Sequence, residues 1–197
     1  MVLLCEQLQE DYKNQPEYIP SYAVELAILT GMRVGEIAAL TWDSISKDGI
    51  LINKSEKYNC KTNTYFIDAT KNKKERLFPM CNEISNLLDK VKKAELQNGY
   101  ICEWVFANED GRVHAPVISS CIKNKCRQLG IEERGIHALR KTFNSKIRNI
   151  GVAPTVAATL LGHSVEVNQK YYTFDVTSND EKKEIVSLIN ENLPLAK

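Results

Sequence analysis

The most constraining feature of this 197-residue sequence is a set of cationic and nucleophilic side chains in five short segments, TGMRVGEIAAL, ATKNKKERLFPM, HALR, LLGHS and QKYYTF. Two guanidiniums, a lysine, two imidazoles and a late tyrosine could bind a phosphodiester, protonate its leaving oxygen and attack its phosphorus. This chemistry requires a fold that brings the segments to one site. The residues concerned are Arg33, Lys71, His137, Arg140, His163 and Tyr172.

The net charge of +1 conceals an uneven distribution of charge along the chain. Residues 1–43 carry two basic and seven acidic groups, and residues 175–197 carry three basic and five acidic groups. Between them, residues 54–76 carry seven basic and three acidic groups, and residues 120–150 carry eight basic and two acidic groups. Two basic blocks between acidic ends suit a phosphate-binding face, although they equally fit two solvated surfaces that never meet.

The hydrophobic content of 43% is sufficient for a packed core, and no run of about eighteen apolar residues predicts a membrane span. The segment YAVELAILTGM predicts a buried helix that ends at Gly31, and VGEIAALTW predicts a second helix directly after it. Arg33 would then lie in the turn between them, where the free N–H groups of a helix N-terminus favour an anion. The alternative is a surface arginine near a helix cap.

Three short runs, GILINKS, TYFIDAT and ERLFPM, predict the strands of a small antiparallel sheet. Residues 71–74 are polar and are predicted to form a hairpin turn between the second and third strands, with lysines at its tip. Lys71 on such a tip could enter a groove and protonate a leaving alkoxide. Lys71, Lys73 and Lys74 could instead steer phosphate or simply be solvated.

The rest of the chain has mainly helical periodicity, so we expect one α+β domain that is mostly α-helical. Residues 104–116 are predicted to be a loop with a turn at Asp110 and Gly111. Helices are predicted from Asn82 to Gln97, up to Gly130, up to Gly151, from Pro154 to Gly162 and, as a final amphipathic helix, over residues 180–193.

The six cysteines contain no CxxC pair, and no His or Cys pair has the spacing of zinc ligands. We therefore expect free, mostly packed thiols in a reducing compartment. The first residues lack the basic start and the long apolar stretch of a signal peptide, which favours a cytoplasmic protein.

Taken singly, the motifs are weak indicators. His137 and Arg140 share one face of a helical turn and could bind a phosphate together, or they could be an ordinary surface pair. His163 follows the glycine that ends a short apolar helix, but it could be satisfied locally in the turn. Tyr172 would need nearby cations to favour its phenolate, most tyrosines serve in packing, and Tyr171 is its immediate rival.

Taken together, the motifs resemble the catalytic domain of the tyrosine recombinases, the phage integrase family. That family presents a T-G-x-R-x-x-E segment, a lysine on a β-hairpin, H-x-x-R, L-L-G-H and a tyrosine nine residues after the last histidine, and all of these occur here in order. The resemblance covers most of the chain, from about Pro20 to Tyr172. Within the family, the sequence is similar in type to the integrases of phages and conjugative transposons. Thr30, Gly31, Arg33 and Glu36 match the first segment.

Alignment of the hairpin on Arg76 and Pro79 selects Lys71 as the family lysine, and the count from His163 selects Tyr172 over Tyr171. The resemblance implies that DNA is cut and rejoined through a 3′-phosphotyrosine, with no cofactor and no metal. Tyr172 would be the nucleophile, and Lys71 would protonate the departing 5′ oxygen.

The remaining site residues also take their roles from the resemblance. Arg33 and Arg140 would hold the non-bridging oxygens of the scissile phosphate. His137 would accept or relay the tyrosine proton, His163 would add a hydrogen bond to the phosphate, and Glu36 would orient a neighbouring arginine. The family usually has a histidine after the second arginine, where this chain has a lysine. Further contacts with DNA phosphates are expected from Lys73, Lys74 and Lys141.

The resemblance further implies that residues 1–197 form a single catalytic domain, with the N-terminal core-binding domain of the family absent from this chain. Residues 176–197 would form a tail helix that docks on a neighbouring protomer or folds back on its own. Expected partners are double-stranded DNA, other protomers in a tetrameric synapse, and accessory DNA-bending or directionality proteins, with no membrane. The expected location is the bacterial cytoplasm, at the nucleoid when on DNA.

Two other classes of function remain open. One is a DNA-binding protein of the same fold that does not cut. The other is a helical interaction protein that binds no nucleic acid, for which the order of the motifs would be a coincidence.

Overall fold

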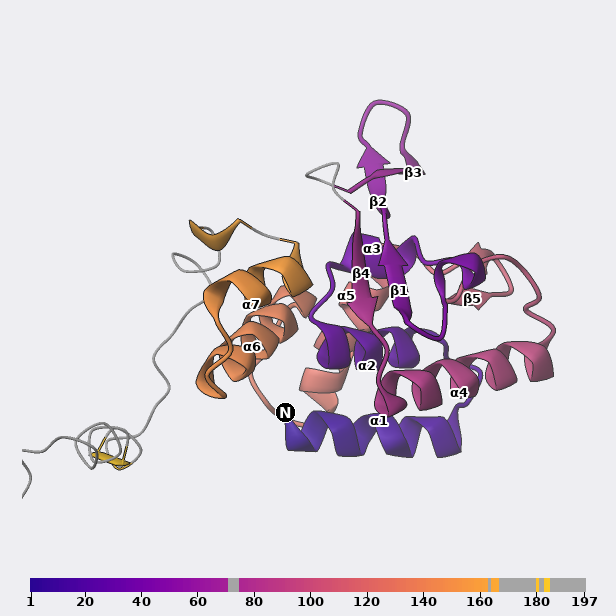
Figure 1. Cartoon of the computed structure of the whole chain (residues 1–197). Helices are drawn as coiled ribbons and strands as arrows, with labels where there is room; N and C mark the ends of the chain where they lie inside the picture. Colours follow the sequence, from indigo (N-terminus) through magenta and orange to yellow (C-terminus); the bar gives the residue numbers. More distant parts are fainter. Residues whose placement is uncertain (71–74, 163, 167–179, 181–182, 185–197) are drawn as a thin grey trace, which may run out of the picture.

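The computed structural model describes residues 1–70, 75–162, 164–166, 180, 183 and 184. Within them the chain is mostly α-helical with short antiparallel strand pairs, which confirms the predicted α+β class (Figure 1). In chain order the elements are α1 (Val2–Asn14), α2 (Pro20–Thr30), α3 (Val34–Ala38), the 3₁₀ helix η1 (Trp42–Ser44), β1 (Gly49–Ile52), β2 (Lys54–Asn59), β3 (Thr64–Ala69), β4 (Arg76–Pro79), α4 (Asn82–Asn98), β5 (Ala107–Asn108), β6 (Gly111–Arg112), α5 (Ala115–Gln128), α6 (Ile136–Asn149) and α7 (Pro154–Leu161).

Helix α2 forms the centre of the hydrophobic core. It begins at Pro20, whose fixed φ suits the first turn of a helix, and eight of its eleven residues are buried. Helices α1, α4, α5 and α6 all pack against it, so it is covered on every side. The prediction of a buried helix in this segment is confirmed.

Gly31 ends α2 in the left-handed conformation, with φ of +61°. A Cβ atom at this position would lie 2.7 Å from Cδ1 of Phe143 on α6. Glycine is therefore required here both for the backbone conformation and for the close packing of α6 on the end of α2.

The strand pairing differs from the prediction. Strand β1 pairs with β4, with Gly49 opposite Pro79, and β2 pairs with β3, with Lys54 opposite Ala69. The predicted hairpin between the second and third β runs, turning at residues 71–74, is wrong, because those runs form β3 and β4 and pair with different strands. The turn between paired strands lies at residues 60–63, where Asn63 takes a positive φ that asparagine tolerates.

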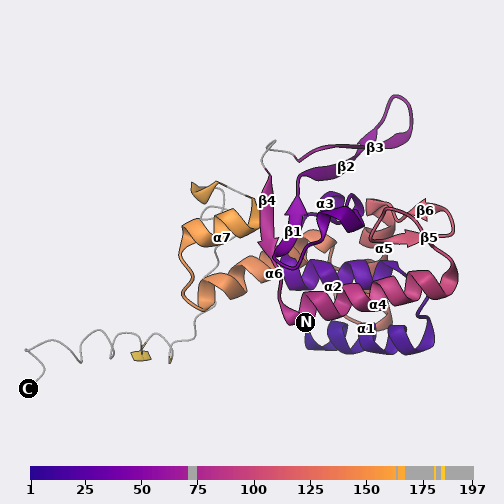
Figure 2. The same ribbon diagram turned by 45° about the vertical axis from the view of Figure 1, so that its right-hand side comes forward.

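The β2–β3 pair projects from the body of the protein as a two-stranded ribbon, above α3 and the β5–β6 pair (Figure 2). Its outer part is solvated and bears the exposed aromatic side chains of Tyr58, Tyr65 and Phe66. The ribbon therefore holds its position through contacts near its base, which are described with the site below.

The structure of two segments, residues 107–112 and helix α1, differs from the prediction or had not been predicted. Residues 107–112, expected in a loop, form the short β5–β6 hairpin, although the predicted turn at Asp110 and Gly111 is correct. Helix α1 had no prediction. It packs on the core through buried Leu4 and Leu8, and its Asp11 carboxylate lies 2.8 Å from Nζ of Lys125 on α5.

The other predicted helices are confirmed as α4, α5, α6 and α7, and the final one, over residues 180–193, falls almost entirely outside the described residues. All six cysteines are free, as predicted, but Cys60, Cys81 and Cys102 are exposed, so the expectation of mostly packed thiols is wrong. No helix in the described part of the chain combines the length and the apolar character that a membrane crossing requires.

Glu95, near the end of α4, should make folding stability depend on pH. Its carboxylate is buried and accepts hydrogen bonds from the Ala107 N–H, at 2.8 Å, and from the Trp42 side chain. Burial outweighs these hydrogen bonds and raises the pKa of Glu95 from 4.5 to about 7. Between these two values the folded chain binds more protons than the unfolded chain, so stability falls as pH rises.

We therefore expect Glu95→Gln, which keeps an acceptor for the N–H groups, to stabilise the protein at pH 8 by on the order of 2 kcal/mol and much less at pH 4.5. Urea unfolding at both values of pH measures this effect. Exposed Glu109→Gln is the matched control. An equal effect of Glu95→Gln at both values would contradict the prediction.

Candidate functional site

One pocket brings together three of the six predicted site residues. It has a volume of about 410 Å³ and is lined by Arg33, His137 and Arg140 together with parts of α3 and β2. Lys57, from the first basic block, lines the same pocket as His137 and Arg140 from the second. The alternative in which the two basic blocks never meet is therefore wrong for these residues.

Arg33 is held in place by the start of α3. It is the N-cap residue, with an extended backbone, and its own N–H donates to Glu36 Oε2 at 3.0 Å. Its Nη1 donates to Glu36 Oε1 at 2.9 Å, and its Nη2 donates to the Gly162 carbonyl at 3.3 Å. About a quarter of the side chain (26%) stays exposed, so the guanidinium is fixed but accessible from the pocket.

Arg140 is almost fully buried, with 1% of its surface exposed. Its Nη1 donates to the Gly31 carbonyl at 2.7 Å, and its Nη2 donates to the Leu161 carbonyl. These carbonyls lie at the C-terminal ends of α2 and α7, where helices leave acceptors unsatisfied and carry partial negative charge. The arrangement offsets the cost of burying the guanidinium and aims it between the two helix ends.

His137 lies in the first turn of α6, one helical turn before Arg140, and its side chain is exposed at the pocket. Desolvation lowers the pKa of His137, and the charges of Arg140, Lys141 and Arg33 lower it further. The imidazole is therefore neutral at pH 7, which leaves one ring nitrogen able to accept a proton.

Glu36 is buried between two arginines. Arg76 on β4 donates to both carboxylate oxygens, from Nη2 to Oε2 at 2.6 Å and from Nη1 to Oε1 at 3.1 Å. Burial by itself would raise the pKa of Glu36, but the hydrogen bonds and charge of Arg76, together with those of Arg33, outweigh it and hold the pKa below its ordinary value. Glu36 thus orients Arg33, as predicted, while the part played by Arg76 was missed.

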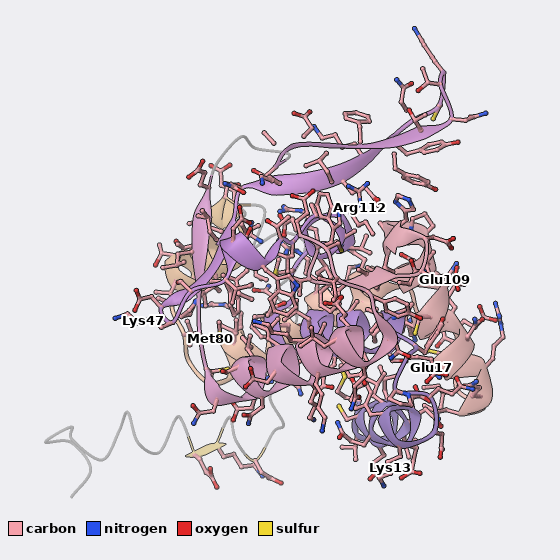
Figure 3. All side chains as sticks on the ribbon, turned by 90° about the vertical axis from the view of Figure 1, so that its right-hand side faces the viewer. Lys13, Glu17, Lys47, Met80, Glu109 and Arg112 are labelled. Atoms are coloured by element: carbon pink, nitrogen blue, oxygen red, sulfur yellow. The ribbon has the colours of Figure 1, made fainter. Side chains whose placement is uncertain are left out.

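A second buried carboxylate fixes the base of the β2–β3 ribbon. Glu56 accepts hydrogen bonds from Arg112 Nη2 at 3.3 Å and from the Ala115 N–H at 2.8 Å, and its Oε2 lies 2.5 Å from Nδ1 of His114. Figure 3 shows Arg112 beneath the ribbon. The His114 ring also stacks on Tyr65, with ring centroids 4.3 Å apart.

Glu56 and the residues around it were not among the predicted site residues. A lone glutamate in a polar, alternating strand has the pattern of a solvated face, so only its burial distinguishes it.

The remaining predicted site residues fall outside the described residues: Lys71, Lys73, Lys74, His163 and Tyr172, together with Tyr171. Lys141 is described and is exposed on α6 next to Arg140, but it does not line the pocket. Most of the predicted tail, residues 176–197, is also outside the described part of the chain. Among the described residues, no three His, Cys, Asp or Glu side chains are grouped in the way that would hold a metal ion.

Comparison with known proteins gives consistent results. The sequence profile described as "Phage integrase family" matches residues 4–177. A tyrosine recombinase XerC-like protein of Caldanaerobacter subterraneus subsp. tengcongensis is 28% identical over 192 residues, covering 84% of this chain and 48% of that protein. The transposase from transposon Tn916 of Enterococcus faecalis is 27% identical over 202 residues, covering 90% of this chain and 49% of that protein. The chain thus spans about half the length of the curated relatives it matches.

Solved structures share the fold. The integrase of transposon Tn1549, solved in complex with circular intermediate DNA, superposes with a TM-score of 0.72 at 18% identity, covering 93% of this chain and 64% of that one. The XerA recombinase superposes with a TM-score of 0.67 at 20% identity, covering 94% of this chain and 62% of that one. At such identities the similarity establishes the arrangement of the helices and strands.

Proposed function

Because the chain belongs to the phage integrase family, we propose that it cuts and rejoins DNA by transesterification, through a covalent bond between Tyr172 and a 3′ phosphate. The observation that carries this proposal is the pocket at which Arg33, from the start of α3, meets His137 and Arg140, both from α6. A neutral imidazole in the same pocket as two guanidiniums suits a site that binds a phosphodiester and accepts a proton.

The two guanidiniums bind the non-bridging oxygens of the scissile phosphate and stabilise the charge that builds up as phosphorus becomes five-coordinate. Both are fixed before the substrate arrives, Arg33 by Glu36 and Arg140 by two helix-end carbonyls. Little reorganisation is then needed during the reaction, which is the condition under which such contacts contribute most.

Two proton transfers accompany the exchange of bonds at phosphorus. The Tyr172 oxygen bonds to phosphorus as its proton passes to His137, and the bond from phosphorus to the 5′ oxygen breaks as that oxygen takes a proton from Lys71. His163 adds a hydrogen bond to the phosphate. Rejoining is the reverse reaction with a 5′ hydroxyl from the partner strand, so the bond energy stays in the phosphotyrosine.

The proposed partners are double-stranded DNA and further protomers of the recombinase, in a tetramer on DNA, with accessory DNA-bending or directionality proteins. Solved relatives support this: the Tn1549 integrase is in complex with DNA, and a lambda integrase dimer is bound to a core site. We further propose phosphate contacts by Lys73, Lys74 and Lys141, and docking of residues 176–197 on a neighbouring protomer. The proposed location is the bacterial cytoplasm.

A covalent-capture experiment tests the reaction. The chain is incubated with a pool of duplexes that carry a random core sequence and a nick, so that cleavage releases a short fragment and cannot be reversed. A denaturing gel then separates protein–DNA adducts, and sequencing of the captured DNA gives the site. We expect an adduct. Binding of DNA that weakens with salt, without any adduct, would instead support the non-cutting DNA-binding protein of the same fold.

A further inference from the structure

Three arginines converge on the last turn of α7. Arg76 Nε donates to the Leu160 carbonyl at 3.0 Å, Arg140 Nη2 donates to the Leu161 carbonyl, and Arg33 Nη2 donates to the Gly162 carbonyl at 3.3 Å. Three successive acceptors at one helix end thus take one guanidinium each, from β4, α6 and the start of α3. Two of these arginines line the pocket, and Arg76 does not.

Like Arg33 and Arg140, Arg76 is held in place by several hydrogen bonds. Only 9% of its side chain is exposed, and all three of its guanidinium nitrogens donate hydrogen bonds, to the Glu36 carboxylate or to the Leu160 carbonyl of α7. Gly162 takes φ of +65°, and a Cβ atom there would lie 2.8 Å from Arg76 Nη1. The guanidinium therefore packs directly on the backbone of Gly162, the residue before His163 in the sequence.

The Glu36 carboxylate is shared evenly between Arg33 and Arg76. Its Oε1 accepts from Arg33 Nη1 and Arg76 Nη1, and its Oε2 accepts from the Arg33 N–H and Arg76 Nη2. Two cations around one anion leave a net charge of +1 on the group. Without Arg76, a carboxylate that is 1% exposed would have Arg33 as its one remaining arginine partner, and the pair would be neutral.

We propose that Arg76 is a positioning residue for the phosphate site. Arg76 pairs with the Glu36 carboxylate, so that Glu36 does not neutralise the charge of the Arg33 guanidinium and Arg33 stays directed toward the pocket. Arg76 also holds the end of α7 against the start of α3. The inference rests on the proposed function in that the anion concerned is the scissile phosphate. Arg76 acts through Arg33 and does not itself reach the pocket.

The test is a double-mutant cycle. Arg76→Met keeps an unbranched side chain, and we expect it to lower the rate of adduct formation by about tenfold to a hundredfold, the range for a displaced site group. Glu36→Gln removes the charge that Arg76 offsets while keeping a residue type found in capping boxes. We expect the double variant to recover most of the lost rate. A purely structural role of Arg76 predicts no recovery.

A second readout does not depend on cutting. The side-chain N–H signals of Arg33 in ¹⁵N spectra are followed as inorganic phosphate is added, and Arg76→Met should weaken this binding severalfold while the double variant restores it. Arg127→Met is the matched control, because Arg127 also forms a two-bond pair with a glutamate, Glu133, but lies near the far end of α5. It should change neither readout.

The outcomes separate this inference from the proposed function. Absence of an adduct with the wild-type chain refutes the reaction, and the phosphate titration still decides the role of Arg76. An adduct that forms equally fast with folded Arg76→Met refutes the inference alone. If Arg76→Met does not fold, the comparison is made in the Glu36→Gln background. There the further change to methionine should lower the rate less than about threefold, and a larger loss refutes the inference.

Discussion

Tyr172→Phe is expected to abolish the covalent protein–DNA link completely, because phenylalanine has no oxygen with which to form the bond to phosphorus. The loss should appear in adduct formation and not in DNA binding, since the guanidiniums that bind the phosphate are unchanged. The measurement is the denaturing gel of the captured adduct, beside a gel-shift titration with the same DNA.

Tyr171→Phe is the matched control for this prediction, because it makes the same chemical change one residue earlier in the sequence. It should leave the adduct in place. If instead the adduct survives in Tyr172→Phe and disappears in Tyr171→Phe, the spacing of nine residues from His163 has selected the wrong tyrosine.

Arg140→Met should lower the rate of adduct formation by about a thousandfold, at the upper end of what one preorganised oxyanion donor contributes. Arg140 lines the pocket and is held by the carbonyls of Gly31 and Leu161, so its guanidinium cannot be replaced by a neighbouring mobile side chain. DNA binding should weaken far less, with the salt dependence falling by about one phosphate contact.

Arg148→Met is the control for Arg140, since Arg148 lies two turns further along α6 and also donates to a backbone carbonyl, that of Val152, without lining the pocket. Single-turnover rates at saturating DNA separate chemistry from binding. A loss that disappears at saturating DNA would mean that Arg140 contributes to binding alone. Thermal unfolding of both variants shows whether the carbonyls that lose a donor destabilise the fold.

The helices could be predicted because their signals are local. Pro20 and Pro154 occupy first turns, and Gly31 and Gly162 end helices in the left-handed conformation, so the bounds of α2 and α7 follow from a few neighbouring residues. The placement of Arg33 at the start of α3 follows from the same local rule.

The pairing of the strands could not be predicted in this way. The runs that form β1, β3 and β4 are all short and apolar enough to pair with one another, and the hydrophobic pattern does not distinguish the partners. Glu56 and Arg112 illustrate the same difficulty for the site, because both have the composition of surface residues and are recognised only through their mutual contact, 56 residues apart in sequence.

The sequence by itself determined the family and the identity and order of the candidate site residues. It also determined the helices on which the candidate site residues in the described part of the chain lie. Both follow because motif spacing and helix caps are properties of neighbouring residues. Only the tertiary structure decided that Arg33, Arg76 and Arg140 meet at the end of α7 and that one buried carboxylate serves two of them. The contacts of the three arginines with the end of α7, and that of Arg76 with Glu36, join residues 21 to 129 positions apart. They depend on how the elements pack, which residue spacing along the chain does not encode.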